Sequence, residues 1–146
     1  MYGQQNKLDL SDGGNRLYEP GVFNGTLKGV VERDSPTGKP MLVFEFMSDD
    51  GRVYDHAEWP VENGDPKRLK NQMERIGVIM SRFVDEGKIT NMTGVTDWLT
   101  YRRFVINTLG NSFQNVPISF KLVPNNYDED NPKVQFPLYK GGMVLQ

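Results

Sequence analysis

The amino-acid sequence predicts a mainly β fold with inserted helices: a five-stranded barrel of the OB-fold plan, with two helices between its third and fourth strands. Three observations predict it. Three strand-like segments joined by short turns occupy 21–60, two helical segments come next, and two more strand-like segments follow. Because strands and helices do not alternate, a doubly wound α/β fold is disfavoured. A half-open roll or a small sandwich with a helical insertion is the main alternative.

The first strand is expected over 21–32, where Phe23, Leu27 and Val31 alternate with polar residues. Gly25 and Gly29 fall on the same apolar face, which suits a strongly coiled strand at a barrel corner. This strand is therefore expected to begin a curved sheet.

The next two strands are expected to form a meander with the first. The segment 40–47 places Leu42, Phe44 and Phe46 on one face, and its alternate residues Met41 and Val43 indicate a covered edge or a subunit contact. The Asp-Gly pair at 50–51 predicts a hairpin turn. In the third strand, 52–59, three of the four odd-numbered positions carry apolar residues. The even-numbered residues are polar and are expected to face solvent: Arg52, Tyr54, His56 and Glu58.

Two helices are expected after the meander. Asp65 followed by Pro66 is a helix start, because Asp is a favoured N-cap and proline suits the first helical position. An apolar stripe of core residues at spacings of four and three then continues to the stop near 86–88; it consists of Leu69, Met73, Ile76, Met80 and Phe83. A second helix is expected from about 96 to a stop at Gly110.

Two strands are expected to complete the domain. They are 116–123, with Ile118, Phe120 and Leu122 inward, and 133–139. The apolar end after 140 is expected to be able to pair with another segment. The predicted organisation is a flexible arm over 1–17, one domain over 18–140 and a short tail over 141–146.

The composition excludes several function classes. The chain has 0 cysteines and 1 histidine, which rules out disulfides, thiolate catalysis and Cys- or His-rich zinc sites. It has no apolar run of membrane-spanning length. Its first residues do not resemble a signal peptide, which predicts a cytoplasmic protein. The net charge of −2 is not that of a duplex-DNA binder, but basic residues gather at 67–70 and 101–103.

No catalytic constellation is evident, and we expect neither an enzyme nor a cofactor or bound metal. The acidic pairs Asp49/Asp50 and Asp128/Asp130 lie in predicted turns, where aspartate commonly bonds the local backbone. His56 is expected to be a hydrogen-bonded surface histidine beside Glu58. A metal-dependent nuclease using Asp128 and Asp130 is therefore the weakest hypothesis.

Basic residues interleaved with aromatic ones on the strands and in adjoining turns predict a nucleic-acid interface. Cations follow the phosphates of a single strand, while rings stack on bases that a duplex would hide. The predicted interface comprises Lys28, Arg33, Lys39, Arg52, Tyr54, Trp59, Lys121, Tyr127, Tyr139 and Lys140. Within it Trp59 is ambiguous, because its parity suits the core or the barrel rim equally well. The alternative is a solvated sheet face.

The chain also resembles the small phage-encoded OB-fold single-stranded DNA-binding proteins. The resemblance spans most of the chain after the arm, and is carried by the opening at 18–23, the hairpin at 37–46, the segment 54–60, the two helices and the strand at 133–137. It implies a host-cytoplasmic protein that coats single strands in DNA replication and recombination. It also implies contacts through Lys28, Arg52, Tyr54, Lys121 and Tyr139. The chain departs from the family by ending without an acidic partner-recruiting tail, which makes recruitment of replication proteins through a tail doubtful.

Two hypotheses follow. The first is a sequence-tolerant single-stranded DNA-binding protein, for which RNA is an alternative ligand because stacking does not distinguish the sugars. The second is a non-catalytic structural or protein-interaction module, such as a phage assembly component. It would form a homo-oligomer through Met41, Val43 and the apolar C-terminus.

Overall fold

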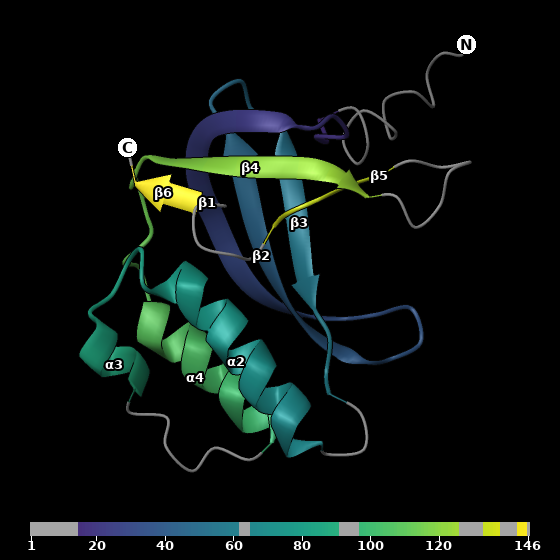
Figure 1. Ribbon diagram of the computed structural model, residues 1–146, viewed down its shortest axis with the longest axis vertical. Helices are drawn as coiled ribbons and strands as arrows, with labels where there is room; N and C mark the ends of the chain where they lie inside the picture. Colours follow the sequence, from purple (N-terminus) through teal and green to yellow (C-terminus); the bar gives the residue numbers. More distant parts are fainter. Residues whose placement is uncertain (1–14, 62–64, 91–96, 126–132, 138–142, 146) are drawn as a thin grey trace.

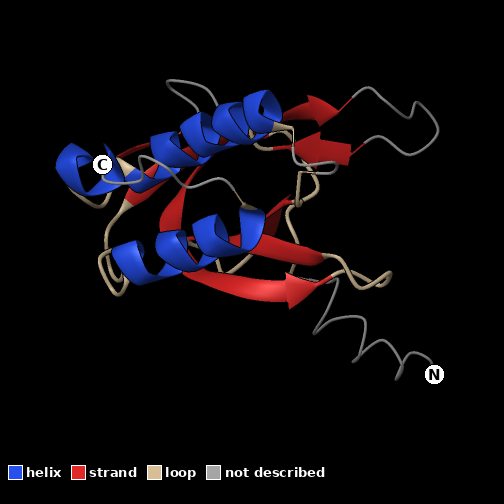
Figure 2. Cartoon of the chain, turned by 90° about the horizontal axis from the view of Figure 1, so that it is seen from below, coloured by secondary structure: helices blue, strands red, loops and turns tan. Residues whose placement is uncertain are grey.

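The computed structural model describes residues 15–61, 65–90, 97–125, 133–137 and 143–145. These residues form an antiparallel sheet with helices packed at one side of it (Figure 1). Viewed from below, the two long helices lie in front of the strands (Figure 2). The predicted mainly β architecture, with helices between the third and fourth strands, is confirmed.

The predicted meander is present at the start of the sheet. Its strands are β1 (Gly21–Asp34), β2 (Pro40–Ser48) and β3 (Val53–Glu58). β1 pairs with β2, and β2 pairs with β3, both antiparallel. Gly38 and Gly51 adopt φ angles of 84° and 87° in the two connecting turns, a backbone region that favours glycine. The turn chemistry of the sequence therefore placed both hairpins correctly.

The later strands are β4 (Ile118–Asn125), β5 (Lys133–Gln135) and β6 (Met143–Leu145). β4 pairs with β1, β5 and β6, all antiparallel. The apolar end of the chain, for which the sequence left a partner open, thus adds a short strand beside β4. The described residues contain six strands, one more than predicted.

The sheet is not closed into a barrel. Its strand order is β3-β2-β1-β4-β5, and among the described residues no ladder joins β3 to β5. The sheet is nevertheless strongly curved, because β1 pairs with β4 at its start and with β2 along most of its length (Figure 1). Gly25 pairs with both Ser48 and Ile118, and a Cβ there would lie 1.9 Å from the carbonyl oxygen of Met47. Only glycine permits this close approach.

Helical segments lie between β3 and β4 as expected, but there are three among the described residues. They are α2 (Pro66–Met80), α3 (Glu86–Thr90) and α4 (Trp98–Leu109). Asp65 caps α2 by accepting from the backbone N–H groups of Lys67 and Arg68, and Asp97 caps α4. The first predicted helix ends early, at Met80, because the backbone tightens there and the Phe83 N–H bonds to the Met80 carbonyl. The predicted stop at 86–88 is therefore wrong, since those residues lie in α3.

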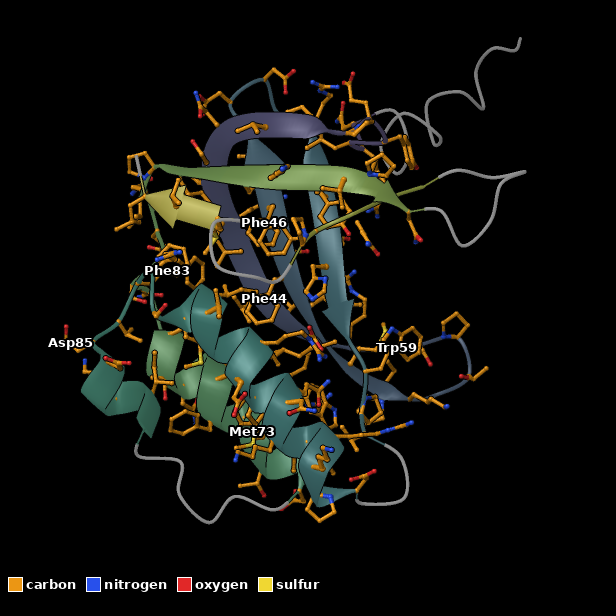
Figure 3. All side chains as sticks on the ribbon, viewed as in Figure 1. Phe44, Phe46, Trp59, Met73, Phe83 and Asp85 are labelled. Atoms are coloured by element: carbon orange, nitrogen blue, oxygen red, sulfur yellow. The ribbon has the colours of Figure 1, made fainter. Side chains whose placement is uncertain are left out.

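The core lies between the curved sheet and the helices (Figure 3). The inner face of β2, with Leu42, Phe44 and Phe46, is fully buried as the alternation predicted. The helices contribute Leu69, Ile76, Ile79 and Met80 from α2 and Trp98, Tyr101, Val105 and Leu109 from α4. The apolar stripe in the sequence was therefore a packing surface, and it attaches α2 to the sheet beside the end of β3.

The predicted faces of β1 are wrong beyond Lys28. Leu27 pairs with Phe46 and Gly29 pairs with Glu45, so Lys28 is an extra residue at a β-bulge. A bulge exchanges the two faces of the strand that follows it. As a result Val30 packs against the core, whereas Gly29 and Val31 lie on the outer face.

The predicted faces of β3 are also reversed. Tyr54, His56 and Glu58 pair with the core residues Phe46, Phe44 and Leu42 respectively. Because directly opposed residues of an antiparallel pair share a face, these three side chains point inward rather than to solvent. The outer residues Met41 and Val43 are 8% and 1% exposed, so they are already buried within the chain.

Residues 15–17, assigned to the N-terminal arm by the sequence, pack against β3. The Leu17 N–H bonds to the Val53 carbonyl, and the Val53 N–H bonds to the Asn15 carbonyl. Leu17 is 2% exposed, so residues 15–17 belong to the folded domain rather than to an arm. Within the described part of the chain, none of the helices combines the length and apolar character that a membrane crossing requires.

Candidate nucleic-acid interface

The residues of the predicted interface do not form one surface. Lys28 and Lys121 are exposed on different strands, at the β1 bulge and on β4. Arg33 and Arg52 lie at opposite ends of the meander, and Tyr54 points inward. Tyr127, Tyr139 and Lys140 lie outside the described residues. Lys39 and Trp59 are brought together in one cleft.

Tyr54 is not a stacking platform in this structure. Its ring packs against the core, and its hydroxyl oxygen accepts a hydrogen bond from the backbone N–H of Phe136 at 3.0 Å. Burial raises the pKa of this phenol. Tyr54 therefore ties the segment after β5 to β3, and its ring packs inward rather than standing on the solvent face that the sequence predicted.

Arg33 belongs to a charge ladder on the outer face of the meander. Its guanidinium lies 3.1 Å from a Glu45 carboxylate oxygen and 3.4 Å from Oδ2 of Asp55. Arg16 lies 3.2 Å from the same Asp55 oxygen. Two arginines thus face two carboxylates, and Glu45 and Asp55 are direct partners across β2 and β3. The basic charge that the sequence placed on this face is neutralised there.

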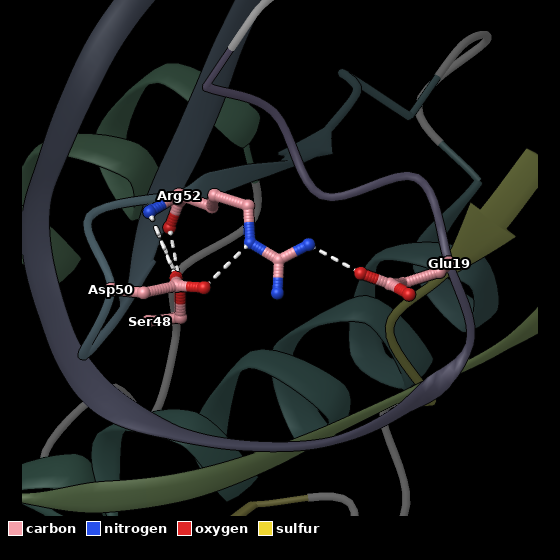
Figure 4. A network of polar contacts seen from close by, with 4 residues as sticks. All are labelled: Glu19, Ser48, Asp50 and Arg52. Atoms are coloured by element: carbon pink, nitrogen blue, oxygen red, sulfur yellow. Dashed lines mark hydrogen bonds and ion pairs between the residues drawn. The ribbon is translucent and has the colours of Figure 1, made fainter.

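Arg52 is engaged in a second ion-pair network, at the turn between β2 and β3 (Figure 4). Its Nε lies 2.9 Å from an Asp50 oxygen, and its other end pairs with Glu19. A hydrogen bond from Ser48 and the pairing with Arg52 lower the pKa of Asp50. Arg52 also lies over the Phe23 ring, 5.6 Å from its centroid. The contacts of Asp50 with Ser48 and Arg52 support its interpretation as a turn residue.

A cleft of about 710 Å³ opens where β3 ends against α2, and we call it the Trp59 cleft. Residues from β3 and its continuation, from α2 and from the turn between β1 and β2 line it. They are Lys39, His56, Ala57, Glu58, Trp59, Pro60, Val61, Arg68, Asn71, Gln72 and Arg75. Lys39 and Trp59, the two predicted interface residues that the structure brings together, therefore both line this cleft.

Trp59 supplies the aromatic surface of the cleft. It follows the last residue of β3, lies beside the lower end of that strand in Figure 3, and is 48% exposed. The other tryptophan, Trp98, is 6% exposed, and its indole N–H donates to the Pro40 carbonyl at 2.7 Å. Only Trp59 of the two therefore offers its indole to a ligand.

Three basic side chains line the same cleft as this indole. Lys39 is exposed at the end of a turn fixed by hydrogen bonds from its backbone N–H to the Ser35 side chain and between the Ser35 and Thr37 hydroxyls. Arg68 is 75% exposed in its side chain and makes a long contact of 3.9 Å with Asp65. Arg75 is 44% exposed and pairs with Glu58. The cleft thus joins an accessible ring to three basic side chains, two of which, Arg68 and Arg75, have an acidic partner.

A buried carboxylate forms the inner wall of the cleft. Glu58 is 3% exposed and accepts hydrogen bonds from Arg75 at 2.8 Å and Gln72 at 3.0 Å, while His56 Nε2 lies 2.7 Å from its other oxygen. Burial alone would favour the neutral acid, but the contacts with His56, Arg75 and Gln72 outweigh it and lower the pKa of Glu58 to about 2. His56 is therefore half-buried in a polar network and is not the surface residue that the sequence predicted.

Sequence reasoning missed the contribution of α2. Arg68, Gln72 and Arg75 recur at spacings of four and three, so they share one face of the helix beside the apolar stripe. The signal was present in the basic cluster at 67–70 and in this spacing. The described residues contain no group of three or more histidine, aspartate or glutamate side chains that could hold a metal ion, and Asp128 and Asp130 lie outside them.

Comparison with protein-family models finds no family that matches this chain, and comparison with curated proteins finds no matching relative.

Proposed function

We propose that this protein binds single-stranded DNA without sequence preference and without catalysis, in replication or recombination, and that the Trp59 cleft is its principal contact. The observation that carries the proposal is an exposed indole that shares with Lys39, Arg68 and Arg75 the lining of a cleft large enough for a nucleotide. Stacking on such a ring accepts every base, because each base has a π face.

The balance of charge supports the cleft over the strand face. Within the described residues, three basic side chains and one acidic residue, Glu58, line the cleft; Arg75 pairs with Glu58, whereas the contact of Arg68 with Asp65 is long, at 3.9 Å. On the outer face of the meander, each arginine faces a carboxylate. A phosphate backbone would therefore be attracted to the cleft and to the neighbouring exposed side chains Lys67 and Lys70 of α2.

We also propose that the domain is an OB-fold. The supporting features are the long, curved β1 shared between β2 and β4, the helices after the third strand, and the hydrogen bond from Phe136 to Tyr54. That bond brings the segment after β5 to β3, where a five-stranded barrel of this type would close. The rings of Phe46 and Phe136, with centroids 4.7 Å apart, lie at the same place.

A fluorescence titration with oligo-dT at several salt concentrations tests the function. We expect quenching of Trp59 and a log–log dependence of affinity on salt with a slope of about −0.7 per phosphate contacted. A duplex of the same length should bind more weakly, because its bases are not available for stacking. Salt-independent binding, or an equal preference for duplex, would contradict the proposal.

A protein-interaction module is the second candidate, favoured by exposed apolar residues. Val22, Val144 and Leu145 are 67%, 44% and 51% exposed, and the last two belong to the short strand β6. Met41 and Val43 no longer support this alternative, since both are buried within the chain. It predicts an oligomer at micromolar concentration, measured by light scattering, that dissociates when Val144 is replaced by lysine and that ignores DNA.

A further inference from the structure

Gln72 links the floor of the Trp59 cleft to Trp59 itself. Its Nε2 lies 3.0 Å from Oε1 of Glu58 and 2.7 Å from the backbone carbonyl oxygen of Trp59. Both hydrogens of this amide thus have acceptors. The reversed amide orientation would place Oε1 against those two acceptors, so the side chain has one favourable orientation.

The partner that anchors Gln72 is itself held firmly. Glu58 is 3% exposed, and Arg75 and His56 fix its two oxygens at 2.8 and 2.7 Å. A chain of contacts therefore runs from α2 and β3 through Glu58 and Gln72 to the backbone of Trp59. Trp59 itself lies one residue beyond Glu58, the last residue of β3 that pairs with β2.

The other end of the Gln72 amide carries a cost to folding. Gln72 is only 3% exposed, and its buried Oε1 has no hydrogen-bond partner among the described residues. A buried acceptor without a partner is unfavourable for folding. An apolar residue of similar length would avoid that penalty, but it would remove the donors to Glu58 and to the Trp59 carbonyl, so what glutamine supplies at this position is the tie to the backbone of Trp59.

We propose that Gln72 is a positioning residue for ligand binding: held by Glu58, it fixes the backbone of Trp59 so that the indole is presented as a stacking platform. The proposal rests on the proposed function of the cleft and identifies which residues organise it before a strand arrives. Preorganisation of this kind raises affinity because less of the ring's freedom is lost on binding. Gln72 itself is not required to touch the nucleic acid.

A double-mutant cycle with oligo-dT of about 16 nucleotides tests this role. Gln72→Met should weaken binding by about twofold to 150-fold, the range of coupling between residues in contact. In a Trp59→Ala background the same substitution should have little further effect, because the ring that Gln72 positions is absent. The salt slope should be unchanged by Gln72→Met, since no phosphate contact is removed.

Gln114→Met serves as the matched control, because it replaces an exposed glutamine outside the cleft. Circular dichroism establishes that each variant is folded, and Gln72→Leu replaces Gln72→Met if methionine does not pack. Equal losses with and without the Trp59→Ala substitution, or unchanged affinity with Gln72 replaced, would overturn the positioning role while leaving the proposed function intact. Failure of the unmodified protein to bind oligo-dT would overturn the function itself.

Discussion

The outer face of the meander and the Trp59 cleft both contain arginine–carboxylate pairs. The two regions differ in how closely their basic side chains are matched by carboxylates. On the outer face Arg16 and Arg33 meet Glu45 and Asp55, so positive and negative charges are equal. In the cleft, the described lining residues include three basic side chains and one carboxylate, the buried Glu58, and the nearby carboxylate of Asp65 makes only a long contact of 3.9 Å with Arg68. The number of basic residues on a strand therefore does not measure its attraction for phosphate.

The two regions also differ in what their ion pairs contribute to stability. The Arg33 side chain is 44% exposed, and surface pairs of this kind contribute about 0–1 kcal/mol. Glu58 lies under the cleft with most of its hydrogen-bonding capacity used. Removing a partner from a buried charge is costly because the charge remains desolvated. The cleft is thus built on a rigid base, whereas the outer pairs mainly neutralise one another.

The largest expected effect concerns that base and is a dependence of stability on pH. The pKa of Glu58 is lowered from 4.5 to about 2 by folding, so the folded state favours its ionised form. The resulting stabilisation is complete above about pH 4.5 and is lost as the pH falls toward 2. Its upper limit is about 3 kcal/mol, from 1.36 kcal/mol per pKa unit. Urea unfolding between pH 7 and 2.5 measures it.

Glu58→Gln is the variant that isolates this effect. It removes the titrating group but keeps an acceptor oxygen, so its unfolding free energy should be lower at neutral pH and should fall less between pH 4.5 and 2.5. Glu45→Gln on the outer face is the comparison, and its pH profile should follow that of the unmodified protein. A Glu58→Gln profile parallel to the unmodified one would show that Glu58 is not the residue responsible.

The next effect concerns the aromatic surface. Trp59→Ala should weaken oligo-dT binding by about 5- to 150-fold, because stacking of one base contributes about 1–3 kcal/mol. Tyr18→Ala is the matched control, since Tyr18 is an aromatic residue that is 64% exposed away from the cleft. Fluorescence anisotropy with labelled oligo-dT measures both. Similar losses from the two substitutions would mean that the cleft is not the principal stacking site.

Much of the fold could be predicted from the sequence because local signals agreed with one another. The Asp65–Pro66 start of α2, the start of α4 close to residue 96 and the apolar alternation in β2 were each correct. The faces of β3 could not be assigned in this way. The side chains of Tyr54, His56 and Glu58 point inward from that strand. Only the register of β3 with β2 determines which of its faces meets the core and which meets solvent.

The candidate site was harder to predict because it depends on distant pairing. The Lys28 bulge in β1, which exchanges the faces beyond it, has no clear signature in a strand that also contains several glycines. The charge of Arg33 is neutralised by residues 12 and 22 positions away. Conversely, Arg68 and Arg75 lie on α2, where the apolar stripe was the stronger signal and indicated core packing. Strand-face composition alone could not show which cations are paired.

The smallest effect tests whether pairing decides which arginines contact phosphate. Arg68→Gln should reduce the magnitude of the oligo-dT salt slope by about 0.7, because one phosphate contact is lost. Arg33→Gln should leave the slope unchanged, since Arg33 already lies 3.1 Å from Glu45 and is not expected to displace counterions from the strand. Titrations at four or more salt concentrations distinguish the two results. If Arg33→Gln reduced the magnitude of the salt slope as much as Arg68→Gln, the outer face of the meander would be part of the DNA interface. Its ion pairs would then have to open when DNA binds.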